Sequence, residues 1–224
     1  MLLARSYTEQ MQAAEAFITL EDIEPVIWRR LLVPVRFTLN GVHRVIQAAF
    51  EWQDYHLHQF EIERVRYDLP DLVEWDPPGR EWCERLLADG VDPTEVKMLC
   101  TPPQDERTVR LSDVIGRGVH QFGYLYDFGD DWRHRVEIES VQEIEVGALP
   151  ALLGGARSAP PEDCGGLPGY EQIQRAYAGT SVDEWGQELA QWTRMRMGPL
   201  WTPETFDAEL IRDRLSRTWR GPRT

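Results

Sequence analysis

The stretch FGYLYDFGDDWRHRVEIE, residues 122 to 139, has large and mostly apolar side chains at every second position on both sides of a short acidic segment. These positions are Phe122, Tyr124 and Tyr126 before the segment, and Trp132, His134, Val136 and Ile138 after it. A period of two places alternate side chains on one face of a β-strand. The stretch therefore predicts two antiparallel strands with a buried aromatic face and with DFGDD as the turn between them.

The turn contains the triplet DFG, which protein kinases use to bind magnesium. A kinase also needs a Gly-rich phosphate loop, a lysine on a strand and an H-R-D loop upstream of the triplet. The sequence has none of these motifs, and its sole lysine, Lys97, lies in a proline-rich region. We therefore interpret DFGDD as a tight turn in which Gly129 takes positive φ and Asp130 or Asp131 accepts a hydrogen bond from its own backbone.

The residues upstream predict a further hairpin, a helix and two short strands. Residues 15 to 33 predict two strands around the turn DIEP, because proline cannot occupy the middle of a sheet. Residues 38 to 52, TLNGVHRVIQAAFEW, predict an amphipathic helix that begins at a Thr38 cap. Its apolar face holds Leu39, Val42, Ile46, Ala49 and Phe50, and its polar face holds His43, Arg44, Gln47 and Glu51. Residues 58 to 67 predict two strands joined by a two-residue turn.

The remaining segments predict an insertion, a long connection and three helices. Six prolines interrupt residues 68 to 106, where only REWCERLLADG has a helical pattern. Residues 142 to 169 predict an irregular connection rich in Pro and Gly. Three helices complete the chain, at about residues 169 to 178, 182 to 195 and 203 to 218. Pro203 suits the first turn of the last helix, where a missing N–H costs least.

This order of elements predicts an α+β fold with a mainly antiparallel sheet, one long amphipathic helix after the first hairpin and a C-terminal group of about three helices. We expect a single domain over residues 14 to 218, with flexible ends at 1 to 13 and 219 to 224. The chain has 224 residues, of which 42% are hydrophobic, so it can bury a substantial core.

The charge balance disfavours nucleic acid as a general partner. The chain has 24 basic and 38 acidic residues and a net charge of −14, which repels phosphates. The strongest local exception is a group of C-terminal arginines, namely Arg212, Arg214, Arg217, Arg220 and Arg223. Cations are also favoured at helix C-termini, so a solvated helix end is preferred to a DNA-binding arm. No basic leader and no apolar run of about 20 residues is present, so we expect a cytoplasmic protein without a membrane span.

The segment WQDYHLHQF, residues 52 to 60, places His56 and His58 two positions apart, on one face if a strand begins there. This spacing can chelate a metal ion, but capping of the preceding helix or hydrogen bonds to the backbone would also explain the pair. Other loops would have to complete a site. The candidates for a third ligand are Asp127, Asp130 and His134 in the hairpin, and Glu162, Asp163 and Cys164 in the segment PPEDCGG. Asp131 and Trp132 join all of these residues in the candidate binding surface.

The three cysteines, Cys83, Cys100 and Cys164, are widely spaced and odd in number, which predicts neither a disulfide framework nor a zinc motif. Cys164 lies among prolines, glycines and acidic residues in a segment that predicts a rigid loop before a helix. It is either a small buried group or a metal ligand, and a thiolate with His56 and His58 would suggest zinc. A divalent metal is therefore the one cofactor that the sequence suggests.

Six segments, in order, carry a family pattern. They are IEPVIWRRLLVP, TLNGVHRVIQAAFEWQDYHLHQFEI, RTVRLSDVI, YLYDFGDDWRHRVEIE, PPEDCGGLPGYEQI and TPETFDAELIRDRL. Together they resemble the plasmid pRiA4b ORF-3-like family, over about residues 14 to 67 and 106 to 216. The resemblance implies a compact α+β domain. It also implies an association with plasmids and mobile elements, where some relatives carry the label resolvase.

The candidate residues, apart from Asp131, match positions in the motifs of that family. In two other places the chain departs from the pattern. Ala159 stands where the family usually has a cysteine, so a two-cysteine metal or disulfide site cannot be carried over. Glu51 replaces a glycine at the end of the first helix, which affects the local cap. The chain also lacks the nucleophile motif of serine recombinases and the residue set of tyrosine recombinases.

Three classes of function follow from these residues. The leading expectation is a non-catalytic binding or accessory domain of a plasmid or mobile-element system, which binds a protein or small molecule in a groove edged by DYHLH, DFGDDWRH and PPEDCGG. The alternative is a metal-dependent hydrolase or nuclease in which His56, His58 and a carboxylate hold the ion. A DNA-binding accessory protein that uses the C-terminal arginines is the third class.

Overall fold

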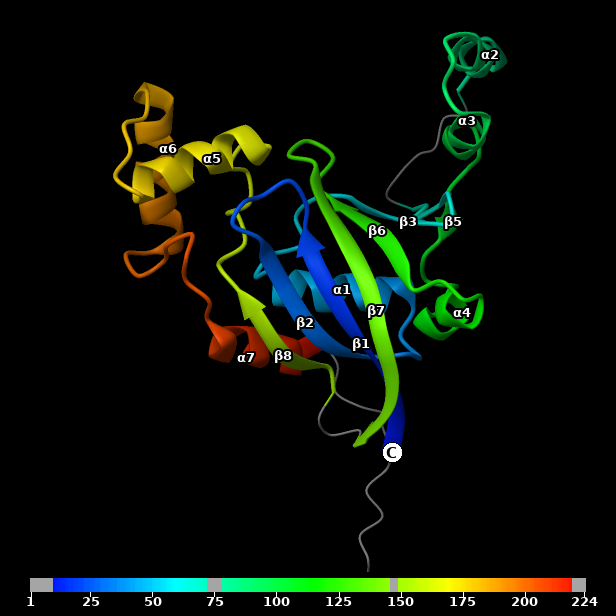
Figure 1. Ribbon diagram of the computed structural model, residues 1–224, viewed down its shortest axis with the longest axis horizontal. Helices are drawn as coiled ribbons and strands as arrows, with labels where there is room; N and C mark the ends of the chain where they lie inside the picture. The colour runs from blue at the N-terminus through cyan, green and yellow to red at the C-terminus, as the bar shows by residue number, and fades with distance from the viewer. Residues whose placement is uncertain (1–9, 72–77, 146–148, 219–224) are drawn as a thin grey trace, which may run out of the picture.

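The computed structural model describes residues 10–71, 78–145 and 149–218, and its frame is one eight-stranded sheet (Figure 1). The strands are β1 (Gln10–Leu20), β2 (Ile27–Pro34), β3 (His58–Ile62), β4 (Val65–Asp68), β5 (Gln104–Asp105), β6 (Gln121–Tyr126), β7 (Trp132–Glu145) and β8 (Ala151–Ala156). Their spatial order is β5-β4-β3-β6-β7-β1-β2-β8, and the pair β4 and β5 is parallel while the others are antiparallel. The predicted α+β class is confirmed.

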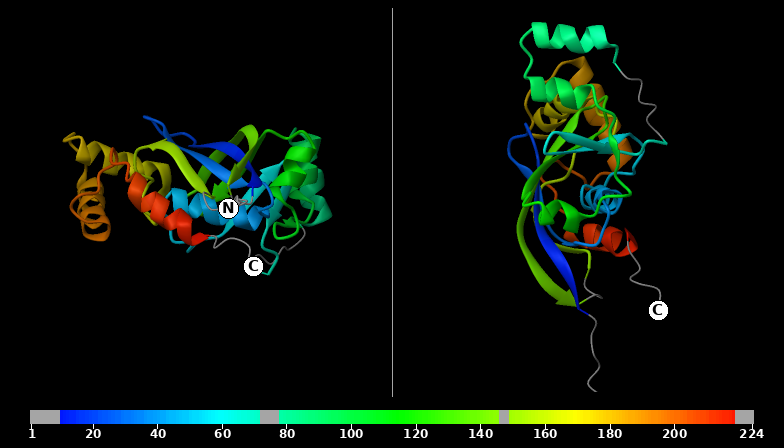
Figure 2. Two further views of the ribbon diagram at one scale, coloured as in Figure 1. Left: turned by 90° about the horizontal axis from the view of Figure 1, so that it is seen from below. Right: turned by 90° about the vertical axis from the view of Figure 1, so that its right-hand side faces the viewer.

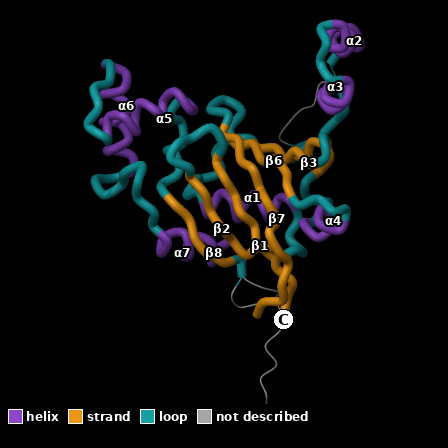
Figure 3. The backbone as a smooth tube through the Cα atoms, in the orientation of Figure 1, coloured by secondary structure: helices purple, strands orange, loops and turns teal. Residues whose placement is uncertain are grey.

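Helices cover one face of the sheet and stand at its two ends. They are α1 (Leu39–Ala49), α2 (Arg80–Ala88), α3 (Pro93–Leu99), α4 (Leu111–Gly116), α5 (Gly166–Tyr177), α6 (Glu184–Met197) and α7 (Ala208–Thr218). Figure 2 shows α1 and α7 together on one face of the sheet, and Figure 3 shows α5 and α6 at one end and α2 and α3 at the other. None of the helices in the described ranges is both long and apolar enough to span a membrane.

The hairpin of residues 122 to 139 forms as its period of two predicts. Tyr124 of β6 pairs with His134 of β7, and both side chains are buried. The conformation predicted for Gly129 is wrong, because the positive φ angles of the turn belong to Asp127 and Asp131, at 58° each. The carboxylate of Asp127 accepts a hydrogen bond from the N–H of Gly129 at 2.9 Å, which is how an aspartate offsets the cost of the left-handed region.

The amphipathic helix α1 begins at Thr38, whose hydroxyl accepts from the N–H of Gly41 at 3.3 Å. His43 and Gln47 lie on the polar side of α1, and both side chains are nevertheless buried. The hydroxyl of Tyr124 on β6 contacts both of them, so the sheet covers this side of the helix as well.

Glu51 follows α1 with a φ of 63°, in the region where glycine has no steric cost. We expect Glu51→Gly to raise the free energy of unfolding by about 0.5–1 kcal/mol, measured by urea denaturation. Glu51→Ala is the matched control, because it removes the same carboxylate and keeps a Cβ at positive φ. An alanine variant as stable as the glycine variant would contradict this explanation of the family's glycine.

The sheet includes more of the chain than the sequence predicts, at the start of β1 and in β8. β1 begins at Gln10, so residues 10–13 pair with β7 and are not part of a flexible end. The predicted irregular connection of residues 142 to 169 also contains the end of β7 and all of β8, which pairs with the edge of β2. Gly154 and Gly155 weaken the strand pattern of β8, and pairing with β2 overrides that weak local propensity.

The insertion contains α2, as predicted, and α3, which the prolines concealed because one of them is the first residue of that helix. A disulfide joins Cys83 of α2 to Cys100 at the end of α3, a pairing that the number and spacing of the cysteines did not predict. The three C-terminal helices are confirmed, but α7 begins at Ala208 rather than at Pro203. The carboxylate of Asp207 accepts from the N–H groups of Glu209 and Leu210 and supplies the cap.

Arg29 ties three elements together from inside the protein. It lies on β2, is fully buried, and donates to the carbonyl oxygens of Ala49, Trp28, Ala156 and Arg157 at 2.8 to 2.9 Å. Its guanidinium also lies 5.1 Å from the ring centres of Phe50 and Phe206. Burial lowers the pKa of Arg29 to about 10, against the opposing charge of Glu51. The residue therefore fixes the end of α1 and β8 against β2.

Candidate functional site

Three loops that carry the predicted site residues meet at one end of the sheet. They are the helix–strand loop (residues 51–57), the hairpin turn (residues 127–131) and the Pro-Pro loop (residues 157–165), and we call their meeting point the loop junction. Figure 1 shows the turn between β6 and β7 beside the start of α5. The indole N–H of Trp52 donates to the carbonyl oxygen of Pro160 at 2.9 Å. The N–H of Gly165 donates to the carboxylate of Asp130 at 3.2 Å.

Glu162 is the buried centre of the loop junction. Its Oε1 atom accepts from the hydroxyl of Tyr126 at 2.6 Å and from the N–H of Gln53 at 3.0 Å. Burial, followed by the hydrogen bond to Glu162, raises the pKa of Tyr126 well above its ordinary value, so its hydroxyl keeps its proton and acts as donor. Both bonds end on Oε1, which leaves Oε2 to accept from a bound molecule.

His56 joins the hairpin turn and the Pro-Pro loop through two carboxylates. Its Nε2 atom lies 3.0 Å from Asp163 Oδ1 and 3.6 Å from Asp127 Oδ2. One ligand atom from each of these residues lies within 4.8 Å of the others, which is a spacing that a metal ion could use. We call His56, Asp127 and Asp163 the His56 cluster. A half-exposed ion-pair network that holds the loops together would have the same contacts.

Asp130 and Asp131 differ in their contacts, since Asp130 is partly buried against the Pro-Pro loop and Asp131 is exposed. Partial burial raises the pKa of Asp130, against hydrogen bonds from the backbone of Gly166 and Gly165. A Cβ at Gly166 would lie 2.8 Å from the carbonyl oxygen of Asp130, so only glycine allows this approach. Asp131 points outward and pairs with Arg133 at 3.0 Å. Asp130 therefore belongs to the loop junction and Asp131 does not contact it.

Three other candidates are core residues in the structure. Trp132, His134 and Cys164 are each about 1% exposed. His134 Nδ1 contacts the carbonyl oxygen of Trp132 at 3.0 Å, and burial lowers the pKa of His134 to about 3. Burial also raises the pKa of the Cys164 thiol well above its ordinary value. Cys164 is placed as a small buried group, and it belongs to neither group of possible metal ligands among the described residues.

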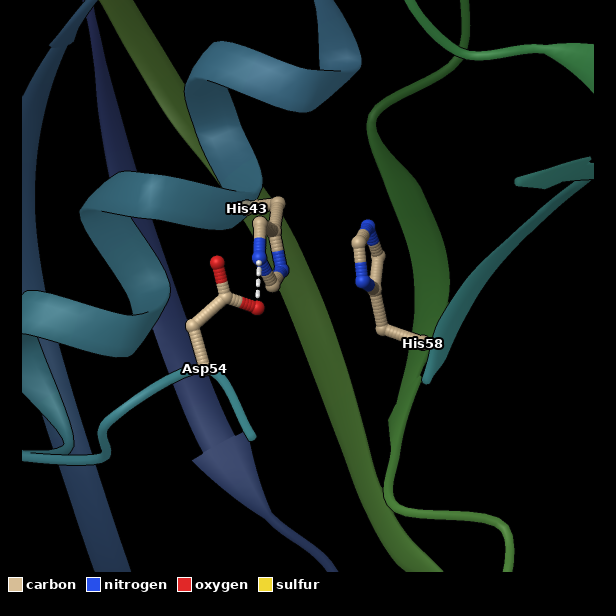
Figure 4. A group of neighbouring side chains, drawn as sticks. All are labelled: His43, Asp54 and His58. Atoms are coloured by element: carbon tan, nitrogen blue, oxygen red, sulfur yellow. Dashed lines mark hydrogen bonds and ion pairs between the residues drawn. The ribbon is translucent and has the colours of Figure 1, made fainter. Parts of the chain in front are cut away.

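His58 lies apart from His56, in a second cluster on the α1 side of the sheet. Figure 4 shows His58 of β3 facing His43 of α1, with Asp54 of the helix–strand loop beside them. The two imidazole rings stack with their centres 3.5 Å apart. His43 Nε2 lies 2.9 Å from Asp54 Oδ1, and His58 Nε2 lies 2.9 Å from Glu106 Oε2. We call His43, Asp54 and His58 the histidine cluster.

A closed ring of hydrogen bonds supports His43. The N–H of Asp54 donates to Gln47, Gln47 donates to the hydroxyl of Tyr124, and that hydroxyl contacts His43 Nδ1 at 2.8 Å. Partial burial acts to raise the pKa of Asp54, but the hydrogen bond with His43 holds it below its ordinary value. Burial lowers the pKa of His43, so the pair is a carboxylate with a neutral imidazole that donates from Nε2. The hydrogen bond from His43 Nε2 to Asp54 Oδ1 closes the ring of hydrogen bonds.

The sequence did contain a signal for the histidine cluster. Asn40, His43 and Gln47 recur at spacings of three and four, which places three polar side chains on one face of α1. Asn40 donates to Glu106, the fully buried carboxylate that also contacts His58. Glu106 could not be found in this way, because it follows the insertion and reaches the cluster only through the pairing of β5 with β4.

The structure does not present the C-terminal arginines as one free basic surface. Arg214 donates to the carbonyl oxygen of Trp52, and Arg217 pairs with Asp213 at 2.6 Å. Arg220 and Arg223 lie outside the described residues. Two of the cations that a DNA-binding arm would use are therefore engaged within the protein.

A pocket of about 300 Å³ opens beside the loop junction. Its lining residues come from the end of α1, the helix–strand loop, the Pro-Pro loop, the end of α6 and the segment between α6 and α7. They are Phe50, Glu51, Trp52, Gln53, Tyr55, Ala159, Pro160, Pro161, Glu162, Arg196, Met197 and Trp201. The pocket thus combines aromatic walls with two carboxylates and one guanidinium.

Comparison with known proteins agrees with this architecture. The family model described as plasmid pRiA4b ORF-3-like protein matches residues 12–210. The uncharacterized protein y4hQ of Sinorhizobium fredii (strain NBRC 101917 / NGR234) is 35% identical over 173 residues, which are 77% of this chain and 76% of that protein. The crystal structure of the protein of unknown function MM3350 from Methanosarcina mazei Go1 is similar with a TM-score of 0.68 and 28% identity, covering 89% of this chain and 96% of that chain.

Proposed function

The chain belongs to the plasmid pRiA4b ORF-3-like family, and from that premise we propose that it is a non-catalytic binding domain whose site is the pocket at the loop junction. An accessory role in plasmid or mobile-element systems is part of the proposal and is supported by the family's name. A cytoplasmic location is also part of the proposal, although the disulfide between Cys83 and Cys100 is of a kind that reducing compartments disfavour.

The observation that carries the proposal is that the pocket walls are fixed before any ligand binds. Trp52 is held by Pro160, and Glu162 is held by Tyr126 and Gln53. A site whose side chains are already ordered loses little conformational entropy on binding, which favours affinity. Its volume of about 300 Å³ is at the lower end of the range for small-molecule sites.

The charges of the pocket indicate a ligand with groups of both signs. Glu51 and Glu162 can accept from an ammonium group, and Arg196 can donate to a carboxylate. The rings of Trp52 and Trp201 provide apolar surface between them. We therefore propose a small zwitterion, such as an α-amino acid or a dipeptide, as the ligand class.

The pocket favours binding over covalent catalysis. Its lining residues all lie in the described part of the chain, and none of them is Ser, Thr, Cys or His. The nearby thiol of Cys164 is buried and its pKa is raised, so it is a poor nucleophile at neutral pH. A nucleophile with an adjacent base is what such catalysis requires.

We expect Glu162→Gln to weaken binding of the zwitterion at least tenfold, because the amide keeps the two hydrogen bonds on Oε1 and removes the charge. The measurement is isothermal titration calorimetry with the twenty amino acids and a dipeptide set, where we expect one or more dissociation constants below about 1 mM. Glu188→Gln, on the exposed part of α6, is the control. No binding to wild type, or equal binding to both variants, would contradict the proposal.

A metal-dependent hydrolase or nuclease is the second candidate, and the His56 cluster is the observation that favours it. Asp130, whose pKa is raised by partial burial, would be the general base. The test is hydrolysis of a chromogenic phosphodiester with added Mn²⁺ or Zn²⁺, by wild type and by His56→Ala. Turnover that the variant loses supports this candidate, and no turnover by wild type counts against it.

A further inference from the structure

The histidine cluster brings two imidazoles and a carboxylate from three separate segments to one point (Figure 4). His43 is 1% exposed and His58 is 5% exposed, while the side chain of Asp54 is 53% exposed. One ligand atom from each residue lies within 4.8 Å of the other two. The cluster is therefore closed on the protein side and open to solvent beside Asp54.

The two imidazoles are already held by their outer nitrogens. His58 Nε2 contacts Glu106 at 2.9 Å, and His43 Nδ1 contacts the hydroxyl of Tyr124 at 2.8 Å. The inner atoms are then His43 Nε2 and His58 Nδ1. Metal-binding histidines almost always have their second nitrogen hydrogen-bonded in this way, often to a carboxylate as at His58. The outer partners of both rings are thus of the kind that a metal site uses.

Among the described residues, His58 forms its hydrogen bond through Nε2 only, to Glu106. His43 Nε2 has only the carboxylate of Asp54, which itself is a ligand type. An ion that enters between these inner atoms would therefore replace a single hydrogen bond.

We propose that His43 Nε2, His58 Nδ1 and the carboxylate of Asp54 bind a divalent first-row transition-metal ion, with solvent in the remaining coordination positions. Two imidazoles and one carboxylate are the ligand set of open zinc and non-haem iron sites. Bonds of about 2.0–2.2 Å require the three atoms to approach one another further. The two rings, which stack with their centres 3.5 Å apart, must also turn so that both nitrogen lone pairs point at one ion, and the exposed side chain of Asp54 is free to move toward them.

The histidine cluster is a better metal site than the His56 cluster for two reasons. It has two nitrogen ligands, whereas the His56 cluster has one and two carboxylates. Its surroundings also hold no cation within salt-bridge distance of Asp54, among the described residues, whereas Asp163 has Arg196 at 3.8 Å. Imidazole ligands favour transition metals, whereas carboxylate ligands favour magnesium and calcium.

The test is a titration of chelator-treated protein with Zn²⁺ in competition with a chromophoric chelator, followed by replacement with Co²⁺ and visible spectroscopy. Asp54→Asn removes the one exposed ligand and should leave the core intact. Asp163→Asn is a closely matched control, because both carboxylates are 53% exposed and both residues have positive φ, at 60° and 64°. We expect one Zn²⁺ per wild-type chain, the same in Asp163→Asn, and at least tenfold weaker binding in Asp54→Asn.

Three results would overturn this proposal. They are no stoichiometric binding by wild type, equal affinity in wild type and Asp54→Asn, and loss of binding in Asp163→Asn, which would assign the ion to the His56 cluster. Visible Co²⁺ bands that persist in Asp163→Asn and change in Asp54→Asn would support it independently of affinity. Zwitterion binding at the pocket is expected to be unchanged by the chelator, so failure of this proposal and failure of the proposed function are separate outcomes.

Discussion

Replacement of Arg29 by alanine is expected to lower the free energy of unfolding by about 4 kcal/mol. The change removes donors from the carbonyl oxygens of four residues and leaves a cavity between Phe50 and Phe206. Relief of the buried charge offsets part of this loss, because its pKa of about 10 reports a cost of burial. Arg29→Lys should recover little, since a single ammonium cannot reproduce the planar set of donors.

Arg30→Ala is the matched control for this prediction. Arg30 is the next residue on β2, points to the opposite face of the sheet, and pairs with Glu139 at 2.8 Å with 41% of its side chain exposed. A partly exposed pair contributes about 0–1 kcal/mol. Urea denaturation of the two variants measures both values. Equal losses would contradict the assignment of Arg29 as the residue that fixes β2, α1 and β8 together.

The second large effect is on the pH dependence of stability and arises from His134. Its pKa is lowered to about 3 in the folded protein by burial, while an unfolded histidine titrates near 6.5. Between these values the unfolded chain binds one more proton, so stability is lost as the pH falls below about 6.5, by up to about 1.4 kcal/mol per pH unit. Above about pH 6.5 the stability that neutral His134 contributes is fully present.

His134→Asn should remove this contribution and keep a donor for the carbonyl oxygen of Trp132. The difference in unfolding free energy between wild type and variant is measured by urea denaturation at pH 4.5, 5.5, 6.5 and 7.5. We expect wild type to be the more stable at pH 7.5 and to lose that advantage toward pH 4.5. His43, whose pKa is also lowered, is present in both proteins and cancels in the difference. A difference that does not change with pH would contradict the prediction.

Periodicity predicted those elements whose apolar side chains recur on one face. The hairpin of residues 122 to 139 and the apolar face of α1 are both of this kind. β8 was missed because its two glycines carry no pattern, and α3 was missed because its first residue is a proline. The pairing of Cys83 with Cys100 depends on how two helices fold onto each other, which spacing along the chain does not give.

The candidate site also has a part that the sequence indicated and a part that it did not. The motif residues suggested a groove edged by the three loops but did not show that the loops meet, and the structure brings Asp127, Asp130, Glu162 and Asp163 together there. The histidine cluster was missed because α1 is buried on a polar face as well, which the amphipathic pattern of one helix cannot indicate. His58 was assigned with His56, but His58 is the first residue of β3 and contacts His43 and Glu106, whereas His56 precedes the strand and contacts Asp127 and Asp163.

Nuclear magnetic resonance of the indole N–H groups tests most directly the claim that the pocket at the loop junction binds a ligand. The protein is labelled with ¹⁵N and titrated with a mixture of the twenty amino acids, then with single amino acids and their N-acetyl amides. We expect the signals of Trp52 and Trp201, which line the pocket, to shift and saturate with the zwitterions only, while those of Trp28 and Trp82 stay unchanged. No shift of Trp52 and Trp201 up to about 10 mM ligand, roughly tenfold above the expected dissociation constant, would contradict it.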